Sequence, residues 1–196
     1  MMARSAPIPA SLEGGNCALA PELQDGVRAG NAEALQALVD LYWEPLLGFA
    51  FRMTGCEDTA EDVVQRAFIR FWERRELWRA GSDPKLILYT VVRNLTLNQL
   101  GSDRARIRRS ADRRMPKAAV PTPVQILDES ELLRALHAAI DKLPPRRREA
   151  LVLARFKNMT HAEIAEVMNL TPRTVTNHIS SALAELEVAL GPYLAD

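Results

Sequence analysis

Side chains that can hydrogen-bond to base edges recur on one face of a stretch near the end of the chain. They are Arg173, Thr176, Asn177 and Ser180. In the major groove of DNA, an arginine fork pairs with guanine and an asparagine amide pairs with adenine. The other face of the stretch is apolar, at Val175, Ile179, Ala182, Leu183 and Leu186. This spacing predicts a half-buried helix whose polar face could read DNA.

Two helices joined by a sharp turn are expected to carry this face. Thr160 and Glu163 have the spacing of a capping box, which starts the first helix. Thr171 is expected to cap the second helix, with Pro172 at its first position, where a missing N–H does no harm. An ordinary helical hairpin with a solvated face would show a similar pattern. We favour a helix-turn-helix that binds DNA, because both caps and both apolar stripes agree.

Two other groups of residues resemble catalytic sites but cannot complete them. Glu61 and Asp62 are adjacent, and adjacent side chains on a helix point in different directions. His161 and Glu163 echo a zinc deaminase motif, but no paired cysteines follow to complete the zinc site. The sequence therefore predicts a protein that is not an enzyme and that has no metal site and no cofactor.

The composition is that of a globular protein with segregated charge. Of its 196 residues, 47% are hydrophobic and 26% are charged. The 25 basic and 25 acidic residues cancel, which is unusual for a protein that holds DNA unaided. Acidic residues gather at 57–62, whereas basic residues gather at 104–117 and 146–148. We therefore expect separate acidic and basic surfaces, and a partner that supplies the remaining affinity for DNA.

The sequence shows no sign of secretion or of a membrane segment. Cys17 and Cys56 form no metal-like pair, which suits a reduced compartment. No apolar run approaches the length of a membrane span, and the N-terminus lacks the apolar core of a signal peptide. We expect a cytoplasmic protein that does not insert into a membrane.

Helical patterns fill the chain and no strand pattern competes, so the fold class is predicted to be all-α. We expect a disordered tail, two small helical domains, and a basic flexible linker between them. Their bounds are 1–20 for the tail, 21–103 for the first domain, 104–124 for the linker and 125–196 for the second domain, which contains the helix-turn-helix.

Local signals place the ends of several helices. Asn31 can cap a helix that ends at Gly55, and Pro45 predicts a kink or a restart within it. Further helices are expected to begin at Asp58 and at Pro84. In the last of these the apolar side carries Leu88, Val91, Val92 and Leu95. Arg93 and Asn94 are expected to point away from that side.

Two blocks of sequence resemble the bacterial sigma-70 family of transcription initiation factors, specifically the compact extracytoplasmic-function (ECF) type. The first is DTAEDVVQRAFIRFWE (58–73) with LYTVVRNLTLN (88–98). The second is LPPRRREALVLARFKNMTHAEIAEVMNLTPRTVTNHISSAL (143–183). The resemblance implies a factor that binds core RNA polymerase and directs it to promoter DNA. It also implies an anti-sigma partner and a linker that passes through the polymerase.

The resemblance also assigns residues to three surfaces. The polymerase-binding residues would be Asp58, Glu61, Asp62, Gln65 and Phe68. Those that bind the −10 promoter element would be Arg75, Trp78, Arg79, Arg93, Asn94 and Asn98. Those that bind the −35 element would be Arg146, Arg147, Arg148, Thr171, Arg173, Thr174, Thr176, Asn177 and Ser180. The chain departs from the family pattern at Ile87, usually Trp, at Asn98, often Asp, and at Thr176 and Ser181, commonly Lys or Arg.

A second interpretation of the helix-turn-helix is a two-domain transcriptional regulator of the response-regulator output type. That class shares the pattern of Glu163, Thr174, Val175 and His178. It acts without being a polymerase subunit, and it would need a βα receiver or ligand domain upstream. No strands are predicted there, so we favour the sigma factor.

Overall fold

The computed structural model describes residues 21–78, 82–110, 131–156 and 158–194, and within these ranges it contains helices and no strand. This confirms the all-α class. The predicted tail at 1–20 lies outside the described residues, as do 111–124 of the predicted linker. No helix in the described ranges is long and apolar enough to cross a membrane.

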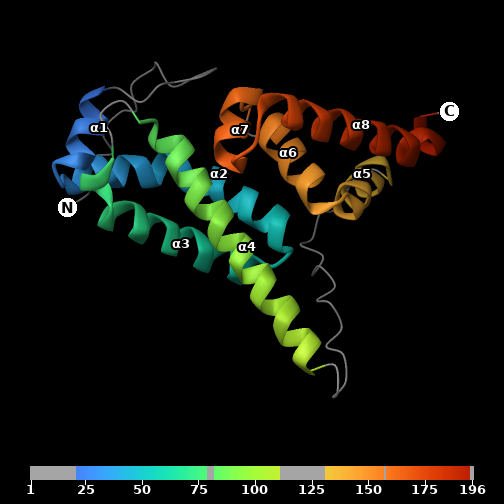
Figure 1. Ribbon diagram of the computed structural model, residues 1–196, viewed down its shortest axis with the longest axis horizontal. Helices are drawn as coiled ribbons and strands as arrows, with labels where there is room; N and C mark the ends of the chain where they lie inside the picture. Colours follow the sequence, from blue (N-terminus) through green and yellow to red (C-terminus); the bar gives the residue numbers. More distant parts are fainter. Residues whose placement is uncertain (1–20, 79–81, 111–130, 157, 195–196) are drawn as a thin grey trace, which may run out of the picture.

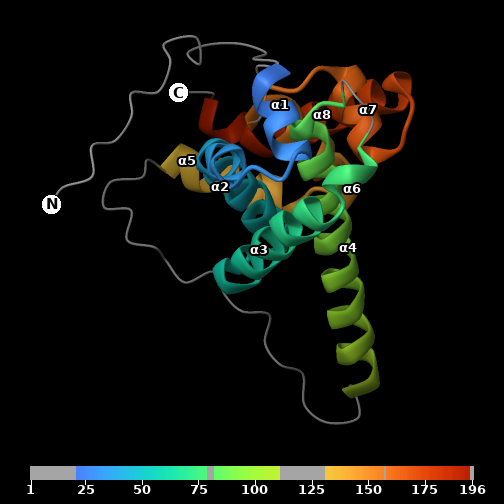
Figure 2. The same ribbon diagram turned by 90° about the vertical axis from the view of Figure 1, so that its left-hand side faces the viewer.

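The helices fall into two consecutive groups (Figure 1). The N-terminal group comprises α1 (Pro21–Arg28), α2 (Ala32–Thr54), α3 (Glu57–Glu73), the short 3-10 helix η2 (Arg75–Leu77) and α4 (Pro84–Ser110). The C-terminal group comprises α5 (Glu131–Lys142), α6 (Pro145–Phe156), α7 (His161–Met168) and α8 (Pro172–Leu194). The end of α4 extends away from all the other helices in both views (Figures 1 and 2).

The helix ends lie where local chemistry predicts them. Asn31 Oδ1 accepts from the backbone N–H of Glu33 at 2.7 Å and of Ala34 at 3.4 Å, so it caps α2. Gly55 ends that helix in the left-handed conformation, with φ of 70°, which glycine adopts without strain. Thr171 Oγ1 accepts from Thr174 N at 3.2 Å at the start of α8.

Two boundaries differ from those expected. The helix does not restart at Pro45, because α2 runs unbroken from Ala32 to Thr54. Proline removes one backbone donor, but burial of Tyr42 and Leu46 on either side of it holds the helix together. α4 continues to Ser110, so the basic segment predicted as linker begins as a helix.

The two groups of helices share one apolar core. α4 packs on α7, and α2 packs on α6. The core therefore joins side chains of α4 to side chains of the C-terminal group, including Leu88, Val92, Leu153, Ile164 and Met168, all buried. A smaller second cluster lies between α5 and α8, around Ile140 and Leu186.

Candidate nucleic-acid interface

The helix-turn-helix is α7 and α8 with the turn between them. Thr160 and Glu163 form the predicted capping box. Asn169 then turns the chain in the left-handed conformation, with φ of 53°. Val175 and Ile179 of α8 are buried, which leaves the opposite face of the helix outside the core. On that face Arg173, Thr176, Asn177 and Ser180 are exposed and Thr174 is half-buried, as the sequence predicted.

Thr176 uses its hydroxyl within the protein. Its Oγ1 donates to the backbone carbonyl of Pro172 at 3.0 Å, and the same oxygen lies 3.0 Å from His161 Nδ1. The hydroxyl therefore has two partners within the protein, and the tautomer of His161 decides which of them accepts its proton. What the side chain can offer to DNA is its methyl group, which suits contact with the methyl group of thymine.

The three arginines expected to contact phosphates have different surroundings. Arg147 forms an ion pair with Glu185 of α8. Arg148 Nη2 donates to the backbone carbonyls of Asp141 and Leu143, at the end of α5. Arg146 is the most exposed, at 52% of its side chain, and lies 3.5 Å from Glu149. Arg146 thus keeps the access that a phosphate contact needs, whereas Arg147 and Arg148 bind within the protein.

The residues expected to meet the −10 element lie on α4 and near η2. Asn94 and Asn98 are exposed on α4. Arg75 donates to the carbonyl oxygen of Trp72 at 3.0 Å, and its guanidinium lies 4.6 Å from the centre of the Trp72 ring. Trp78 packs on Phe71 with ring centres 3.7 Å apart. Arg79 lies outside the described residues.

Arg93 is buried. The prediction that its side chain is accessible to nucleic acid is therefore wrong for this arrangement of the helices. Its side chain is 8% exposed and its Nε donates to Glu149 of α6. Its Nη1 also donates to Asn94 Oδ1 at 3.2 Å. Glu149 is fully buried; burial raises its pKa, and the nearby charges of Arg93 and Arg146 oppose that rise. Nothing in the local sequence pattern predicts this pair, because its members are 56 residues apart.

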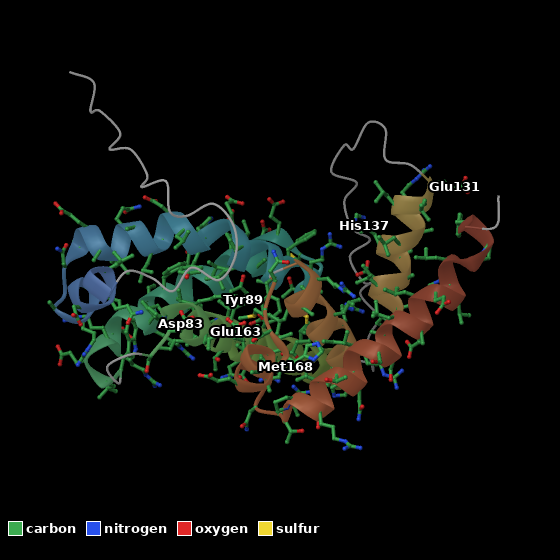
Figure 3. All side chains as sticks on the ribbon, turned by 90° about the horizontal axis from the view of Figure 1, so that it is seen from above. Asp83, Tyr89, Glu131, His137, Glu163 and Met168 are labelled. Atoms are coloured by element: carbon green, nitrogen blue, oxygen red, sulfur yellow. The ribbon has the colours of Figure 1, made fainter. Side chains whose placement is uncertain are left out.

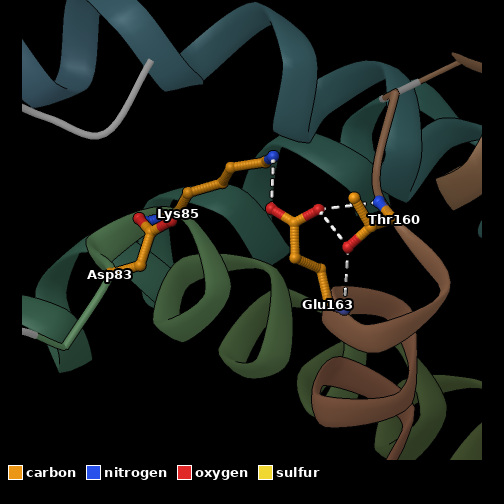
Figure 4. Close-up of polar contacts among 4 residues, drawn as sticks. All are labelled: Asp83, Lys85, Thr160 and Glu163. Carbon is orange, nitrogen blue, oxygen red and sulfur yellow. Dashed lines mark hydrogen bonds and ion pairs between the residues drawn. The ribbon is translucent and has the colours of Figure 1, made fainter. Parts of the chain in front are cut away.

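A second ion pair joins the same two groups of helices. In Figure 3, Glu163 of α7 lies over α4, on which α7 packs. Glu163 Oε1 accepts from Lys85 Nζ at 3.1 Å, while its Oε2 accepts from the backbone N–H of Thr160 at 2.7 Å (Figure 4). Burial alone would raise the pKa of Glu163, but the hydrogen bonds from Thr160 and the Lys85 ammonium outweigh it and lower the pKa.

The candidate polymerase-binding surface is on α3. Asp58, Glu61 and Gln65 are exposed, and Asp62 pairs with Arg66 at 3.0 Å in solvent. Phe68, by contrast, is only 7% exposed. It lines a hollow of about 300 Å³ beside α2, together with Leu35, Ile69, Trp72 and Glu73.

Ile69 was not predicted as a site residue. It is 57% exposed, one of the most exposed large apolar side chains described. The sequence held a signal for it, because Ile69 is the apolar residue that falls outside the buried stripe of α3.

The chain matches two family models, in the order in which they would occur in one protein. The model of sigma-70 region 2 matches residues 38–106, and the model of sigma-70 region 4 matches residues 133–186. Together the two models cover more than half of the chain. The first includes most of α2, all of α3 and most of α4, and the second includes the helix-turn-helix.

Curated relatives are similar over most of their length. The RNA polymerase sigma-H factor of Pseudomonas aeruginosa is 28% identical over 187 residues, which cover 89% of this chain and 95% of that protein. The ECF RNA polymerase sigma factor SigW of Bacillus subtilis is 26% identical over 162 residues, with 78% and 87% covered.

Solved structures share the fold. The sigma factor RpoE of Bartonella quintana, in complex with the anti-sigma factor NepR, superposes with a TM-score of 0.68 at 23% identity, covering 80% of this chain and 96% of that one. CnrH, in complex with the cytosolic domain of CnrY, gives a TM-score of 0.66 at 23% identity, with 88% and 97% covered. At this identity the likeness concerns the arrangement of helices.

Proposed function

This chain belongs to the sigma-70 family of RNA polymerase sigma factors, of the ECF type, and on that premise we propose how its exposed faces divide promoter recognition. It is a transcription initiation factor that binds core RNA polymerase and directs it to promoters. The observation that carries the division of labour is the exposed polar face of α8, at Arg173 and Asn177, on a chain that also contains region 2.

We propose that α3 binds core polymerase through its acidic start and the adjoining apolar hollow. Asp58, Glu61 and Gln65 present polar groups to solvent, and Ile69 offers apolar surface along the same helix. The Asp62–Arg66 pair is exposed, so breaking it should cost the fold less than about 1 kcal/mol. Substitution here therefore tests binding and spares folding.

The test is holoenzyme assembly. We expect Asp62→Lys with Gln65→Ala to reduce co-elution with core polymerase while helicity stays unchanged. The matched control is Glu187→Lys, a charge reversal at an exposed position of α8. Equal co-elution of the double variant and the control would refute the assignment of α3.

We propose that Asn94 and Asn98 act at the −10 element, where strand opening exposes base edges to amide groups. Asn94→Ala should impair transcription from duplex promoters and alter the preference for one −10 base, with holoenzyme assembly spared. Ser102→Ala, at an exposed position further along α4, is the control. Unchanged activity on every −10 variant would contradict the base-reading role.

We propose that α8 reads the −35 element in duplex DNA, with Arg173 and Asn177 contacting bases and Arg146 contacting phosphate. Each good base contact is worth about 1–3 kcal/mol of discrimination. Run-off transcription with core polymerase and fragmented genomic DNA would identify the promoters. Arg173→Ala should then change the preferred −35 base at one position. An equal loss on all −35 variants would make Arg173 a phosphate contact instead.

Partners and setting follow from the family. The structural neighbours RpoE and CnrH were solved with NepR and with the cytosolic domain of CnrY, and we propose that an anti-sigma factor also binds this chain. We place the protein in the cytoplasm, with the polymerase. Its role is non-enzymatic. The response-regulator alternative is not favoured, since a sigma-70 region 2 lies upstream of the helix-turn-helix.

A further inference from the structure

His161 links the two helices of the helix-turn-helix, beside the face of α8 proposed to read the −35 element. It is the first residue of α7, and it is exposed. Its Nδ1 lies 3.0 Å from Thr176 Oγ1. Thr176 belongs to the exposed polar face of α8, together with Arg173 and Asn177. The imidazole of His161 therefore lies at the edge of the reading face, where α7 and α8 meet.

The other ring nitrogen of His161, Nε2, is available to a group outside the protein. Within the described ranges, Thr176 is the one hydrogen-bond partner of this imidazole, and it lies at Nδ1. The N–H directions of the two ring nitrogens diverge widely, so Nε2 points away from Thr176. No function has been assigned so far to this exposed donor or acceptor.

The docking geometry of a helix-turn-helix brings His161 to the DNA backbone. The second helix lies in the major groove, while the first crosses the sugar–phosphate backbone. His161 begins the first helix and contacts the second, so it reaches the edge of the groove as α8 enters it. The groove edge is lined by phosphate oxygens, which accept hydrogen bonds and do not donate them.

The charged form of the ring suits such a phosphate and keeps the contact with Thr176. Both ring nitrogens carry a proton in the imidazolium, whereas the neutral ring has one proton for the two positions. In the charged form Nδ1 donates to Thr176 Oγ1, whose own proton goes to the carbonyl of Pro172. Nε2 then donates to the phosphate, in a charge-assisted hydrogen bond that is stronger than a neutral one.

The charge of His161 would not be neutralised within the described part of the protein, where no ion pair to it is formed. Helices α4, α6 and α8 pack on α7. Many charged groups of these four helices have partners elsewhere: Lys85 with Glu163, Arg93 and Arg146 with Glu149, Arg147 with Glu185, and Arg148 with two backbone carbonyls. The groups left exposed are Arg155, Glu166, Arg173 and Glu187, and the half-buried His178 is the other histidine of these helices.

We propose that His161 is a further DNA contact, in which the charged imidazole donates from Nε2 to a phosphate at the edge of the −35 duplex. The inference rests on the proposed reading of the −35 element by α8. Histidine is the side chain that ordinarily changes charge between pH 5 and 8. A bound phosphate favours the charged form, so DNA binding takes up a proton and strengthens as the pH falls through this range.

The test is promoter binding by holoenzyme at about pH 6 and about pH 8, on either side of that change. The promoter is one found by run-off transcription. We expect the parent to bind about fivefold more tightly at the lower pH, the size of an exposed charge pair. His161→Asn should lose this gain, because its amide reaches Thr176 from the place of Nδ1 and has no group at the place of Nε2. His161→Arg stays charged and should bind tightly at both pH values.

The salt dependence of the same binding distinguishes a phosphate contact from an effect through Thr176. One phosphate contact steepens the log–log slope by about 0.9. The parent's slope should therefore be steeper by this amount at the lower pH, relative to the change seen for His161→Asn. His161→Arg should keep the steeper slope at both pH values. A pH-dependent affinity with an unchanged slope would make His161 a residue that orients Thr176, and would overturn the proposal.

The matched control is His178→Asn, the same substitution at the other histidine of these helices. It should keep the parent's pH dependence, and titration of the polymerase itself affects every variant alike. Equal pH profiles of the parent and His161→Asn, with helicity retained, would refute the contact, as would loss of the pH dependence in His178→Asn alone. Should His161→Asn lose helicity, a pH dependence in His161→Arg equal to the parent's would refute it as well. A parent holoenzyme that ignores the −35 sequence at both pH values would instead count against the proposed function of α8.

Discussion

Arg148 could act in DNA binding or in holding the fold together, and the two roles predict different effects of its substitution. The family resemblance makes it a phosphate contact, whereas its Nη2 donates to the carbonyls of Asp141 and Leu143, the second at 3.4 Å. These carbonyls lie at the C-terminal end of α5, where backbone acceptors have no helical partner and a positive charge is favourable. We predict that Arg148→Met destabilises the protein and leaves its salt-dependent DNA binding unchanged.

The expected magnitude follows from these contacts. A hydrogen bond from a charged donor contributes about 1.5–3 kcal/mol. Arg148 is only half-buried and its bond to Leu143 is long, so we take the lower end, about 1.5–2 kcal/mol for the two bonds together. Methionine retains most of the aliphatic stem, so that the loss reports mainly on the guanidinium.

Two assays separate the roles. Urea unfolding of the free chain should show the loss of about 1.5–2 kcal/mol for Arg148→Met, with an unchanged dependence on urea. Promoter binding by holoenzyme, measured against salt concentration, should keep the parent's slope. Arg146→Ala is the comparison: losing one phosphate contact should flatten the log–log slope by about 0.9.

An exchange of behaviour between the two arginines would refute these two roles. A flatter salt slope for Arg148→Met, with stability within error of the parent, would mean that the guanidinium leaves the end of α5 to contact DNA. The structural assignment of Arg148 would then be wrong, and the role implied by the family resemblance would be right.

Substitutions at three further positions test individual contacts. Glu163 has a lowered pKa in the folded chain. Its stabilising effect is therefore present above its ordinary pKa and is lost as the pH falls through the lowered value. Glu163→Gln should reduce the pH dependence of the free energy of unfolding in the acid range, measured by urea unfolding at several pH values. Because the hydroxyl of Thr176 is bound to Pro172, Thr176→Val should keep the −35 preference. Thr176→Ser removes the methyl group, so holoenzyme should lose about 0.8 kcal/mol of binding free energy, or about fourfold in affinity, for promoters with thymine at one −35 position. A larger loss for valine than for serine would contradict the methyl contact. Asn31→Ala should cost about 1 kcal/mol in urea unfolding, with no change in −35 preference.

Features that depend on neighbouring residues were predictable from the sequence. The caps at Asn31 and Thr160 and the stop at Gly55 are set within three or four residues, and the structure confirms each. The polar face of α8 follows from helical periodicity, and it is exposed as predicted. Of the kink or restart predicted at Pro45, the restart does not occur, because burial of Tyr42 and Leu46, which a local pattern does not register, offsets the local cost of the proline.

Contacts between distant segments were not predictable in this way. Arg93 lies on the expected polar side of α4, and only the fold brings Glu149 against it. Arg148 carries the same charge as Arg146 and belongs to the same run of arginines. Only the fold shows that Arg148 binds the end of α5 while Arg146 stays exposed. For the candidate site, the sequence therefore indicated which helices carry the chemistry, and the packing determined which of their side chains remain accessible.

The core shared by α4, α6 and α7 constrains how such factors could be recombined. Joining the −35 reader of one factor to the −10 reader of another would place unrelated apolar surfaces against each other. Leu88 and Val92 would face side chains of the wrong shape, and Arg93 would lack its acidic partner. A chimaera could thus inherit the donor's promoter preference and still be poorly restrained when it is not bound to polymerase. Grafting only the exposed face of α8 onto this scaffold would transfer the preference and keep the native contact.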